Sequence, residues 1–415
     1  MPIAAPPISD GAVVIGDDGR IVAVGPDASV PHPPGVPTEL FPGCALIPGL
    51  VNTHTHLELT GLGGTIASDD FVAWIARLRE LKAARSAADA FAAACQGGRD
   101  CWAAGVTTVA DTGDTGAVIR ALHDLGGAGI CYQEVFGPDP GQVLESMAFL
   151  RDRVAALGPF VGPRIRLGVS PHAPYSASAP LYREVAEFAR AAGLPIAVHL
   201  AESVAESDLV VHGTGAFAAL WARRKIAVPA PARTAVEYLD RSGVLGADTL
   251  AIHLVWADAA DIATLAARDT AVAHCPLSNR NHRHGEAPLA AMLAAGLRVG
   301  VGTDSVASVG RLDLLAEARA ARILGALDAE AALALCTTAA AAALGLAGEV
   351  GSLRRGGWGD VVAVRLRDPF PGDLFEAVLA SGPADVVATW VGGREVFRTT
   401  THPLRFQGDS LPVGA

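Results

Sequence analysis

The stretch at residues 48–56, PGLVNTHTH, joins an apolar run to two closely spaced histidines. The apolar run and the residues before it predict a strand over Ala45–Val51. His54 and His56 follow at a spacing of two, and in extended backbone residues i and i+2 point to the same side. Both imidazoles can therefore face one end of the strand and reach one ion. Because this short pattern also arises by chance, its meaning depends on the rest of the chain.

Seven further β-rich runs follow, and Ala-rich stretches with helical periodicity, such as Ala179–Ala192, separate most of them. The eight predicted strands are Ala45–Val51, Thr107–Asp111, Gly129–Phe136, Arg164–Ser170, Pro195–Leu200, Thr249–Leu254, Thr270–Cys275 and Arg298–Gly302. Eight strand-plus-helix units are typical of a (β/α)₈ TIM barrel, which takes about 250 residues. The longest insertions follow the first strand, at Leu57–Ala84, and the fifth, at Ser203–Asp240.

Both ends of the chain read as hairpins. Ala12–Ile15 and Arg20–Val24 flank an Asp-Gly turn, and the tail offers Asp360–Arg365, Val386–Val391 and Glu395–Arg398. We therefore expect a small β-sandwich-like domain built from residues 1–47 and 346–415, with a catalytic barrel over residues 48–345.

Composition excludes several classes of protein. Of the 415 residues, 51% are hydrophobic and 18% charged, which argues against disorder. The net charge of −11 disfavours nucleic acid or an anionic membrane as partner. The six cysteines form no C-x-x-C pair, and the N-terminus lacks the pattern of a signal peptide, so we expect a cytoplasmic protein. Its expected partner is a small-molecule substrate, and the sequence leaves a homodimer open.

The carboxyl ends of the predicted strands carry metal-ligand residues, where barrel enzymes place their catalytic groups. His54, His56, His199, His253 and Asp304 all lie there. Imidazole and carboxylate suit Zn²⁺ first, with Fe²⁺ and Mn²⁺ as alternatives. Two-metal barrels often use a lysine on strand four, but the chain has only two lysines and neither lies on a predicted strand. We therefore expect one divalent ion, held by His54, His56, His199 and Asp304.

Asp304, Glu202 and His253 have predicted catalytic roles at the mouth of the barrel. Asp304 accepts the proton of the attacking water, Glu202 shuttles protons to the substrate, and His253 orients the forming oxygen. Four residues are expected to contact substrate, and they are His172, Glu134, Asn279 and Trp74.

Ordinary alternatives stay open for several of these residues. His172 can be a supporting residue, Asn279 a loop cap and Trp74 a core residue. His282 and His284 read as solvated loop residues. Arg280 and Arg283, on the same loop, are weak candidates for binding a substrate carboxylate.

Taken together, residues 48–56 with His199, Glu202, His253 and Asp304 resemble the amidohydrolase superfamily, in its mononuclear deaminase branch. Glu134 and the segments SPHAPY at 170–175, HCPLSN at 274–279 and GTDSVAS at 302–308 look like those of aminodeoxyfutalosine deaminases. That resemblance implies deamination of aminodeoxyfutalosine to futalosine, on a route to menaquinone.

Other activities of the same scaffold remain alternatives. They are methylthioadenosine/adenosylhomocysteine, guanine or cytosine deamination, a chlorohydrolase or amidase, and a non-enzymatic relative. By analogy with adenosylhomocysteine deaminases, an acidic residue that binds the ribose diol is expected after the first strand. Within Arg77–Lys82 the acidic residue is Glu80, which disfavours the adenosylhomocysteine deaminase and leaves ribose recognition unassigned.

Overall fold

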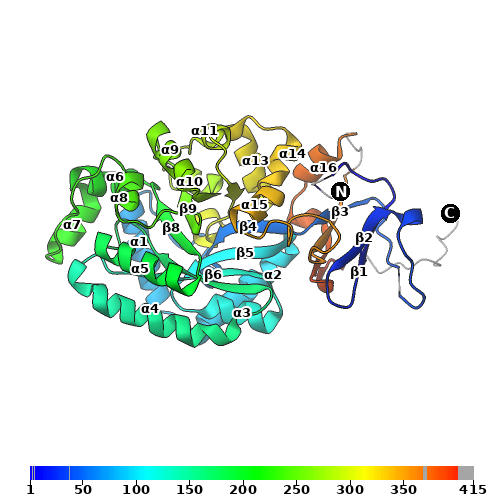
Figure 1. Ribbon diagram of the computed structural model, residues 1–415, viewed down its shortest axis with the longest axis horizontal. Coiled ribbons are helices and arrows are strands. Elements are labelled where there is room, and N and C mark those ends of the chain that lie inside the picture. The colour runs from blue at the N-terminus through cyan, green and yellow to red at the C-terminus, as the bar shows by residue number, and fades with distance from the viewer. Residues whose placement is uncertain (2, 4, 37, 368–371, 401–415) are drawn as a thin grey trace.

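The computed structural model describes residues 1, 3, 5–36, 38–367 and 372–400, and it has two parts. A barrel with its helices forms the larger part, and a smaller β part sits at one end of it (Figure 1). The mouth of the barrel, near α7 (Gly215–Arg223), lies at the opposite end from the smaller part.

Eight parallel strands form the barrel, in the order in which they follow along the chain. They are β4 (Leu50–Thr55), β5 (Val106–Gly113), β6 (Gly129–Val135), β7 (Ile165–Pro171), β8 (Ile196–Leu200), β9 (Thr249–His253), β10 (Ala271–His274) and β11 (Val299–Val301). A parallel bridge between Thr55 and Asp304 joins the last strand to the first, where the Asp304 N–H donates to the His54 carbonyl at 3.0 Å. The predicted TIM barrel is therefore confirmed.

The first predicted strand is in fact two strands that belong to different sheets. β3 (Cys44–Pro48) pairs antiparallel with β12 (Val361–Arg365) in the smaller part, and β4 begins at Leu50. Gly49 separates them, and a Cβ there would lie 2.0 Å from Thr107 Oγ1. Only glycine lets the chain pass this close to the neighbouring barrel strand.

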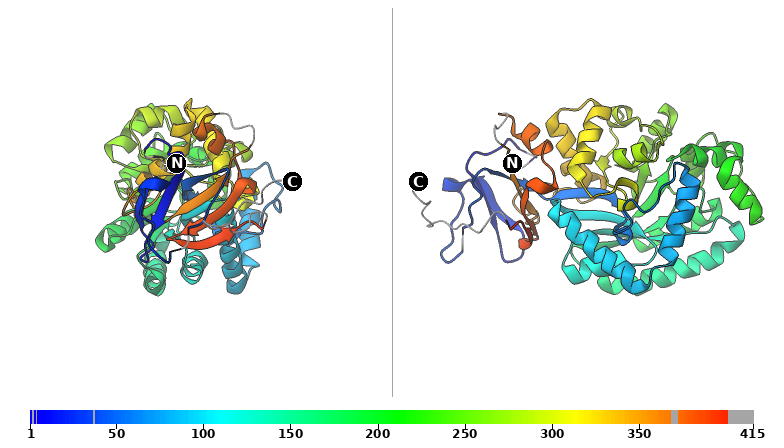
Figure 2. Two further views of the ribbon diagram at one scale, coloured as in Figure 1. Left: turned by 90° about the vertical axis from the view of Figure 1, so that its right-hand side faces the viewer. Right: turned by 180° about the vertical axis from the view of Figure 1, so that it is seen from behind.

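The smaller part holds two antiparallel sheets built from both ends of the chain. One pairs β1 (Gly11–Ile15) with β2 (Ile21–Pro26), and the other has the order β14–β13–β12–β3, with β13 at Val386–Val391 and β14 at Arg394–Arg398. Ile21 of the first sheet packs with Val361 of the second, so the two sheets face each other as a small sandwich (Figure 2). The expected sandwich-like part is thus present, and the exact domain boundaries stay a prediction.

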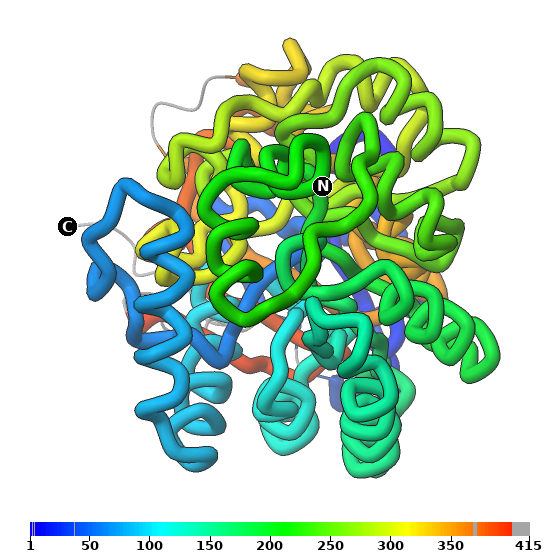
Figure 3. The backbone as a smooth tube through the Cα atoms, turned by 90° about the vertical axis from the view of Figure 1, so that its left-hand side faces the viewer, coloured from blue at the N-terminus to red at the C-terminus, as the bar shows by residue number. Residues whose placement is uncertain are grey.

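Helices surround the barrel, and several segments cover its mouth (Figure 3). The helices of the described part are α1 (Phe71–Ala83), α2 (Ala87–Ala103), α3 (Ala117–Leu125), α4 (Val143–Leu157), α5 (Ala179–Ala192), α6 (Val204–Ser207), α7, α8 (Ala235–Arg241), α9 (Ala259–Ala267), α10 (Pro276–Asn281), α11 (Leu289–Ala294), α12 (Val306–Val309), α13 (Leu314–Gly325), α14 (Ala329–Ala334), α15 (Thr338–Ala343) and α16 (Leu374–Leu379). The first long insertion contributes α1, and the second contributes α6 and α7 and runs into α8. Among the described residues, no helix has the length and apolar character needed to cross a membrane.

Candidate metal centre and active site

Four histidines from three strand ends meet at the mouth of the barrel. His54 lies in β4 and His56 directly follows it, His199 lies in β8, and His253 ends β9. The ring of His54 lies 4.7 Å from that of His56 and 5.0 Å from that of His199, measured between centroids. One ring nitrogen from each of these three residues falls within 4.8 Å of the others. The structure therefore brings the predicted imidazoles together.

Asp304 joins the cluster from the residues that follow β11. Its Oδ1 lies 3.5 Å from His56 Nε2 and 3.7 Å from His54 Nε2. The Ser305 N–H donates to the same oxygen at 2.7 Å, and the Ser278 hydroxyl donates to Oδ2. Burial opposes ionisation of Asp304, but its contacts with His54 and His56 outweigh burial and hold its pKa well below the usual range. Asp304 is therefore an ionised carboxylate facing two imidazoles.

The backbone around this cluster departs from ordinary strand geometry. Ala201, His253, Leu254 and Asp304 all have positive φ angles, of 52°, 77°, 52° and 56°. A positive φ strains a residue other than glycine by about 1–3 kcal/mol, and it persists where the surrounding fold enforces it. They follow the carboxyl ends of β8, β9 and β11, so the strain marks the functional face of the barrel.

The donor set fits a divalent cation. Both ring nitrogens of His54 are buried without a hydrogen-bond partner. His56 Nδ1 lies 2.8 Å from the Thr112 carbonyl oxygen, and His199 Nδ1 lies 3.1 Å from that of His172. Since a carbonyl oxygen only accepts, each Nδ1 carries the proton and each Nε2 keeps its lone pair. Burial lowers the pKa of His54 and His199, and lowers that of His56 to about 3, which favours the neutral imidazole that binds a metal.

We expect one divalent ion per chain, with zinc as the first choice. Imidazole and carboxylate are ligand types that zinc prefers. Elemental analysis of unchelated protein should give close to one equivalent. Two equivalents would contradict the mononuclear prediction. A bond from the ion to His253, with Asp304 distant, would contradict the choice of ligands.

Glu202 and His253 form an acid–base pair beside the three predicted histidine ligands. Glu202 Oε1 lies 3.6 Å from His253 Nε2 and 3.5 Å from His284 Nε2, and the Glu202 side chain is almost fully buried. Burial alone would raise the pKa of Glu202, but His253 and His284 lower it to about 2. His253 Nδ1 lies 2.9 Å from Asn279 Oδ1, which fixes the ring so that Nε2 faces Glu202.

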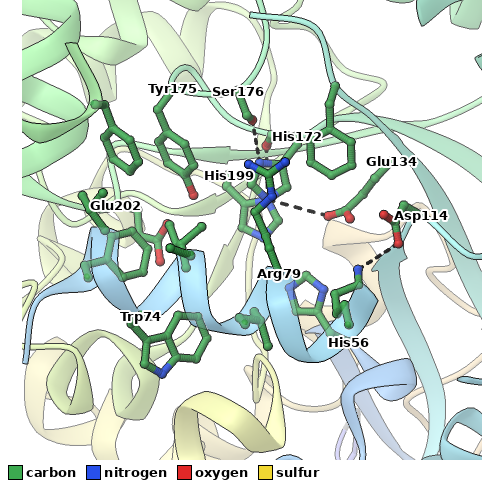
Figure 4. Close-up of a pocket in the computed structure, with 18 of the residues that line it drawn as sticks. His56, Trp74, Arg79, Asp114, Glu134, His172, Tyr175, Ser176, His199 and Glu202 are labelled. Carbon is green, nitrogen blue, oxygen red and sulfur yellow. Dashed lines mark hydrogen bonds and ion pairs between the residues drawn. The ribbon is translucent and has the colours of Figure 1, made fainter. Parts of the chain in front are cut away.

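A second group of polar residues lies across His199 from Glu202 (Figure 4). The Ser176 hydroxyl lies 2.7 Å from His172 Nδ1, and His172 Nε2 lies 3.9 Å from Glu134 Oε1. Glu134 is 3% exposed, and its Oε1 has no hydrogen-bond partner. Burial raises its pKa to about 8. A buried, unsatisfied carboxyl on a pocket wall is costly, by about 1–3 kcal/mol, which is typical of a group kept for binding.

Lys82 anchors α1 to the barrel next to Glu134. Its Nζ lies 2.8 Å from Glu58 Oε1 and 2.8 Å from Asp114 Oδ1. Burial would lower the pKa of Lys82, but attraction to these two carboxylates raises it, so the ammonium group stays charged. Lys82, Asp114 and Glu134 all line the pocket.

Most of these groups line one cavity of about 640 Å³, among them His56, His199, Glu202, Glu134 and Asp304. Its other wall is aromatic, with Phe71, Trp74, Tyr175, Phe217 and Trp221 among its lining residues. Trp74 is on the cavity wall and packs against the His282 ring, with centroids 4.6 Å apart. Asn279 is not among the lining residues, because it sits behind His253. The structure therefore places Asn279 in a supporting position.

The loop after β10 differs from its sequence-based reading. His284 is only 5% exposed and faces Glu202, and His282 lines the cavity, so neither is a solvated loop residue. Arg280 and Arg283 do not line the cavity, and Arg283 Nη1 lies 2.9 Å from Asp69 Oδ2.

Two arginines that the sequence did not single out line the cavity instead. Arg79 lies on α1 and Arg224 directly follows α7. Among the described residues, the Arg79 side chain has no hydrogen bond or ion pair, and it reaches toward His172 (Figure 4). Both arginines belong to the insertions, where strand-based reasoning says nothing about which side chains face inward.

Comparison with known proteins assigns this chain to a family. Residues 45–396 match the model of the amidohydrolase family. A 5-methylthioadenosine/S-adenosylhomocysteine deaminase of Symbiobacterium thermophilum is 30% identical over 407 residues, covering 94% of this chain and 89% of that protein. An aminodeoxyfutalosine deaminase of Deinococcus radiodurans is 32% identical over 337 residues, covering 76% of each.

A solved structure agrees with these matches. The adenosine deaminase of Xanthomonas campestris, solved with bound zinc, superposes with a TM-score of 0.81 at 25% identity, covering 95% of this chain and 90% of that one. The chain therefore belongs to the amidohydrolase family, as its motifs indicated, and is a hydrolase that acts on C–N bonds.

Proposed function

We propose that this protein is a metal-dependent hydrolytic deaminase of 6-aminopurine nucleosides. The observation that carries the proposal is the ionised Glu202 carboxylate, buried beside His253 and next to the histidine cluster. An amidase needs its acid–base group at a leaving amine, whereas deamination of an aromatic ring also needs a proton delivered to a ring nitrogen. Glu202 is placed to hold and move that proton.

A divalent ion held by His54, His56, His199 and Asp304 would supply an activated water for attack on the amino-bearing carbon. Asp304, ionised and facing this position, accepts a proton from the water. Glu202, ionised at rest, takes up the other proton of the water and passes it to the adjacent ring nitrogen, while the proton on Asp304 leaves with the amine as ammonia. His253 Nε2 is held toward the pocket through Asn279, and in its protonated form it stabilises the developing charge on oxygen. The net reaction converts the amine and water into an oxo compound and ammonia.

The preferred substrate we propose is aminodeoxyfutalosine, which places the protein in menaquinone biosynthesis. Its sugar hydroxyls need both donors and acceptors, and Lys82, Asp114 and Glu134 provide them on one wall. Its benzoate needs a cation, and Arg79 and Arg224 line the same cavity. The Deinococcus radiodurans relative named for this activity adds support.

A second candidate is a 5-methylthioadenosine/S-adenosylhomocysteine deaminase. The relative from Symbiobacterium thermophilum that carries this name matches 94% of this chain. The substrates of both candidate activities contain the adenine ring and ribose, so they differ only in the group that would occupy the outer part of the cavity.

The test is ammonia release by metal-loaded protein from a panel of amines. It comprises aminodeoxyfutalosine, adenosine, methylthioadenosine, adenosylhomocysteine, cytosine and guanine. We expect the highest kcat/KM for aminodeoxyfutalosine. Faster turnover of adenosine or methylthioadenosine would replace this assignment with the broader nucleoside deaminase, and no ammonia from any nucleoside would overturn the deaminase proposal.

A variant of Arg79 sharpens the test. Arg79→Met should lower kcat/KM for aminodeoxyfutalosine by about 10-fold or more, because a hydrogen bond to a charged group contributes about 1.5–3 kcal/mol. Adenosine, which lacks the carboxylate, should be affected far less. Arg77→Met is the matched control, because Arg77 lies on the same helix, bonds Glu80 at 2.7 Å and does not line the cavity.

A further inference from the structure

Glu206 is a buried carboxylate that binds the backbone on which Glu202 is carried. It lies in α6 and is fully buried, with 0% of its surface exposed. The Ala201 N–H donates to Glu206 Oε1 at 2.8 Å, and the Glu202 N–H donates to Glu206 Oε2 at 3.0 Å. Each oxygen therefore holds one of two consecutive amides, and the second amide belongs to Glu202 itself.

This arrangement departs from the capping motif that the local sequence encodes. Ser203 and Glu206 have the S-x-x-E spacing of a capping box, in which the glutamate returns to the N–H of the serine. The serine half forms, since Ser203 Oγ accepts from the Glu206 N–H at 3.3 Å. The Glu206 carboxylate instead reaches one and two residues further back, to Glu202 and Ala201. Capping the helix thus does not account for its contacts.

The backbone held in this way is strained. Ala201 has a φ of 52°, in the left-handed region that alanine disfavours. Its N–H is bound by Glu206, and its carbonyl accepts from the Trp256 N–H at 2.9 Å. This turn after β8 directs the next side chain, Glu202, to within 3.6 Å of His253 Nε2. Without the carboxylate, two buried amides would lack acceptors and the turn could relax.

We propose that Glu206 is a positioning residue, which sets the place of the Glu202 carboxylate by binding the amides of Ala201 and Glu202. The inference rests on the proposed deaminase function, and it holds whichever nucleoside is preferred. It assigns no contact with substrate to Glu206. Its influence on catalysis runs through Glu202 alone.

The first test is Glu206→Gln, which keeps the shape of the side chain but puts an NH₂ group against one of the two N–H donors. We expect kcat to fall about 10- to 10²-fold with metal content and KM little changed, because displacement of a catalytic group by about 1 Å has effects of this size. Glu206→Asp keeps two acceptor oxygens on a shorter stem and should recover part of the loss.

A double-mutant cycle separates positioning from general damage. In protein that already carries Glu202→Gln, adding Glu206→Gln should change kcat by less than about 2-fold, because the carboxylate being positioned is gone. If the two losses multiply instead, Glu206 does not act through Glu202 and the proposal is wrong.

Asp360→Asn provides the matched control. Asp360 is also a buried carboxylate that accepts from a backbone N–H, that of Gly392, at 2.7 Å, and it pairs with Arg164 at 2.6 Å, away from the mouth. The Asp360→Asn substitution should lower the melting temperature without a comparable fall in kcat of the folded protein. An equal fall in kcat would mean that any lost buried carboxylate has this effect, and it would overturn the proposal.

Hydrogen exchange tests the same contact without any substrate. Amides of residues 200–203 should exchange faster in Glu206→Gln than in wild type, and Asp360→Asn should leave them unchanged. Unaltered protection in Glu206→Gln would overturn the proposal even if no nucleoside were deaminated. Absence of deamination by wild-type protein, by contrast, counts against the proposed function only.

Discussion

Replacing Glu202 by glutamine should lower kcat by about 10²–10⁴-fold, the usual contribution of a positioned acid–base group. The amide has the shape of the carboxylate but cannot accept a proton from one site and release it at another. Glu202 is ionised in the resting protein, because His253 and His284 lower its pKa to about 2. The variant therefore removes the acceptor form that begins the proton transfer.

Metal content is the control for this variant. We do not assign Glu202 as a ligand, so elemental analysis should still give one equivalent, and the melting temperature should change little. Single-turnover kinetics with saturating nucleoside would place the loss in the chemical step. Turnover close to wild type in metal-loaded Glu202→Gln would remove Glu202 from the mechanism.

Replacing His253 by asparagine should lower kcat by about 10²–10³-fold, the effect typical of losing one donor to a developing oxyanion. The substitution is chosen because asparagine can keep a donor near the position of Nδ1, where His253 meets Asn279 Oδ1 at 2.9 Å. It removes Nε2, the nitrogen that faces Glu202. KM should rise less than kcat falls, since the interaction forms mainly in the transition state.

Metal retention decides between two roles for His253. One equivalent of metal in His253→Asn agrees with a residue that acts on the substrate oxygen. Loss of the metal would mean that His253 is a ligand, and the choice of Asp304 in its place would have to be revised.

The fold was predictable from the sequence because each barrel strand is an apolar run with a helical stretch after it. The division at Gly49 was not, since it depends on the closeness of Thr107 in the neighbouring strand, and contact between strands is invisible in a single run of residues. Parallel strands end at the same face, so the convergence of His54 with His199 could be inferred from strand ends alone.

The residues that line the sides of the pocket were harder to predict than the metal-ligand residues at the strand ends. Arg79 and Arg224 sit on insertions whose orientation depends on tertiary packing, and their side chains resemble ordinary surface arginines in the sequence. His284 was misjudged for the same reason, because its loop folds inward against Glu202. Glu206 has the spacing of a helix cap, and only its hydrogen bonds distinguish it from one.

The pairing of β3 with β12 has a consequence for the order in which the chain can fold. Cys44 lies opposite Arg365, so the four-stranded sheet cannot assemble until nearly the whole barrel has been synthesised. Such distant contacts slow folding much more than they weaken stability, since closing a loop costs only about 0.6 kcal/mol more for each doubling of its length. During translation, β3 therefore stays unpaired until β12 has been made after the barrel, and β13 and β14 follow to complete the sheet that joins the two ends of the chain.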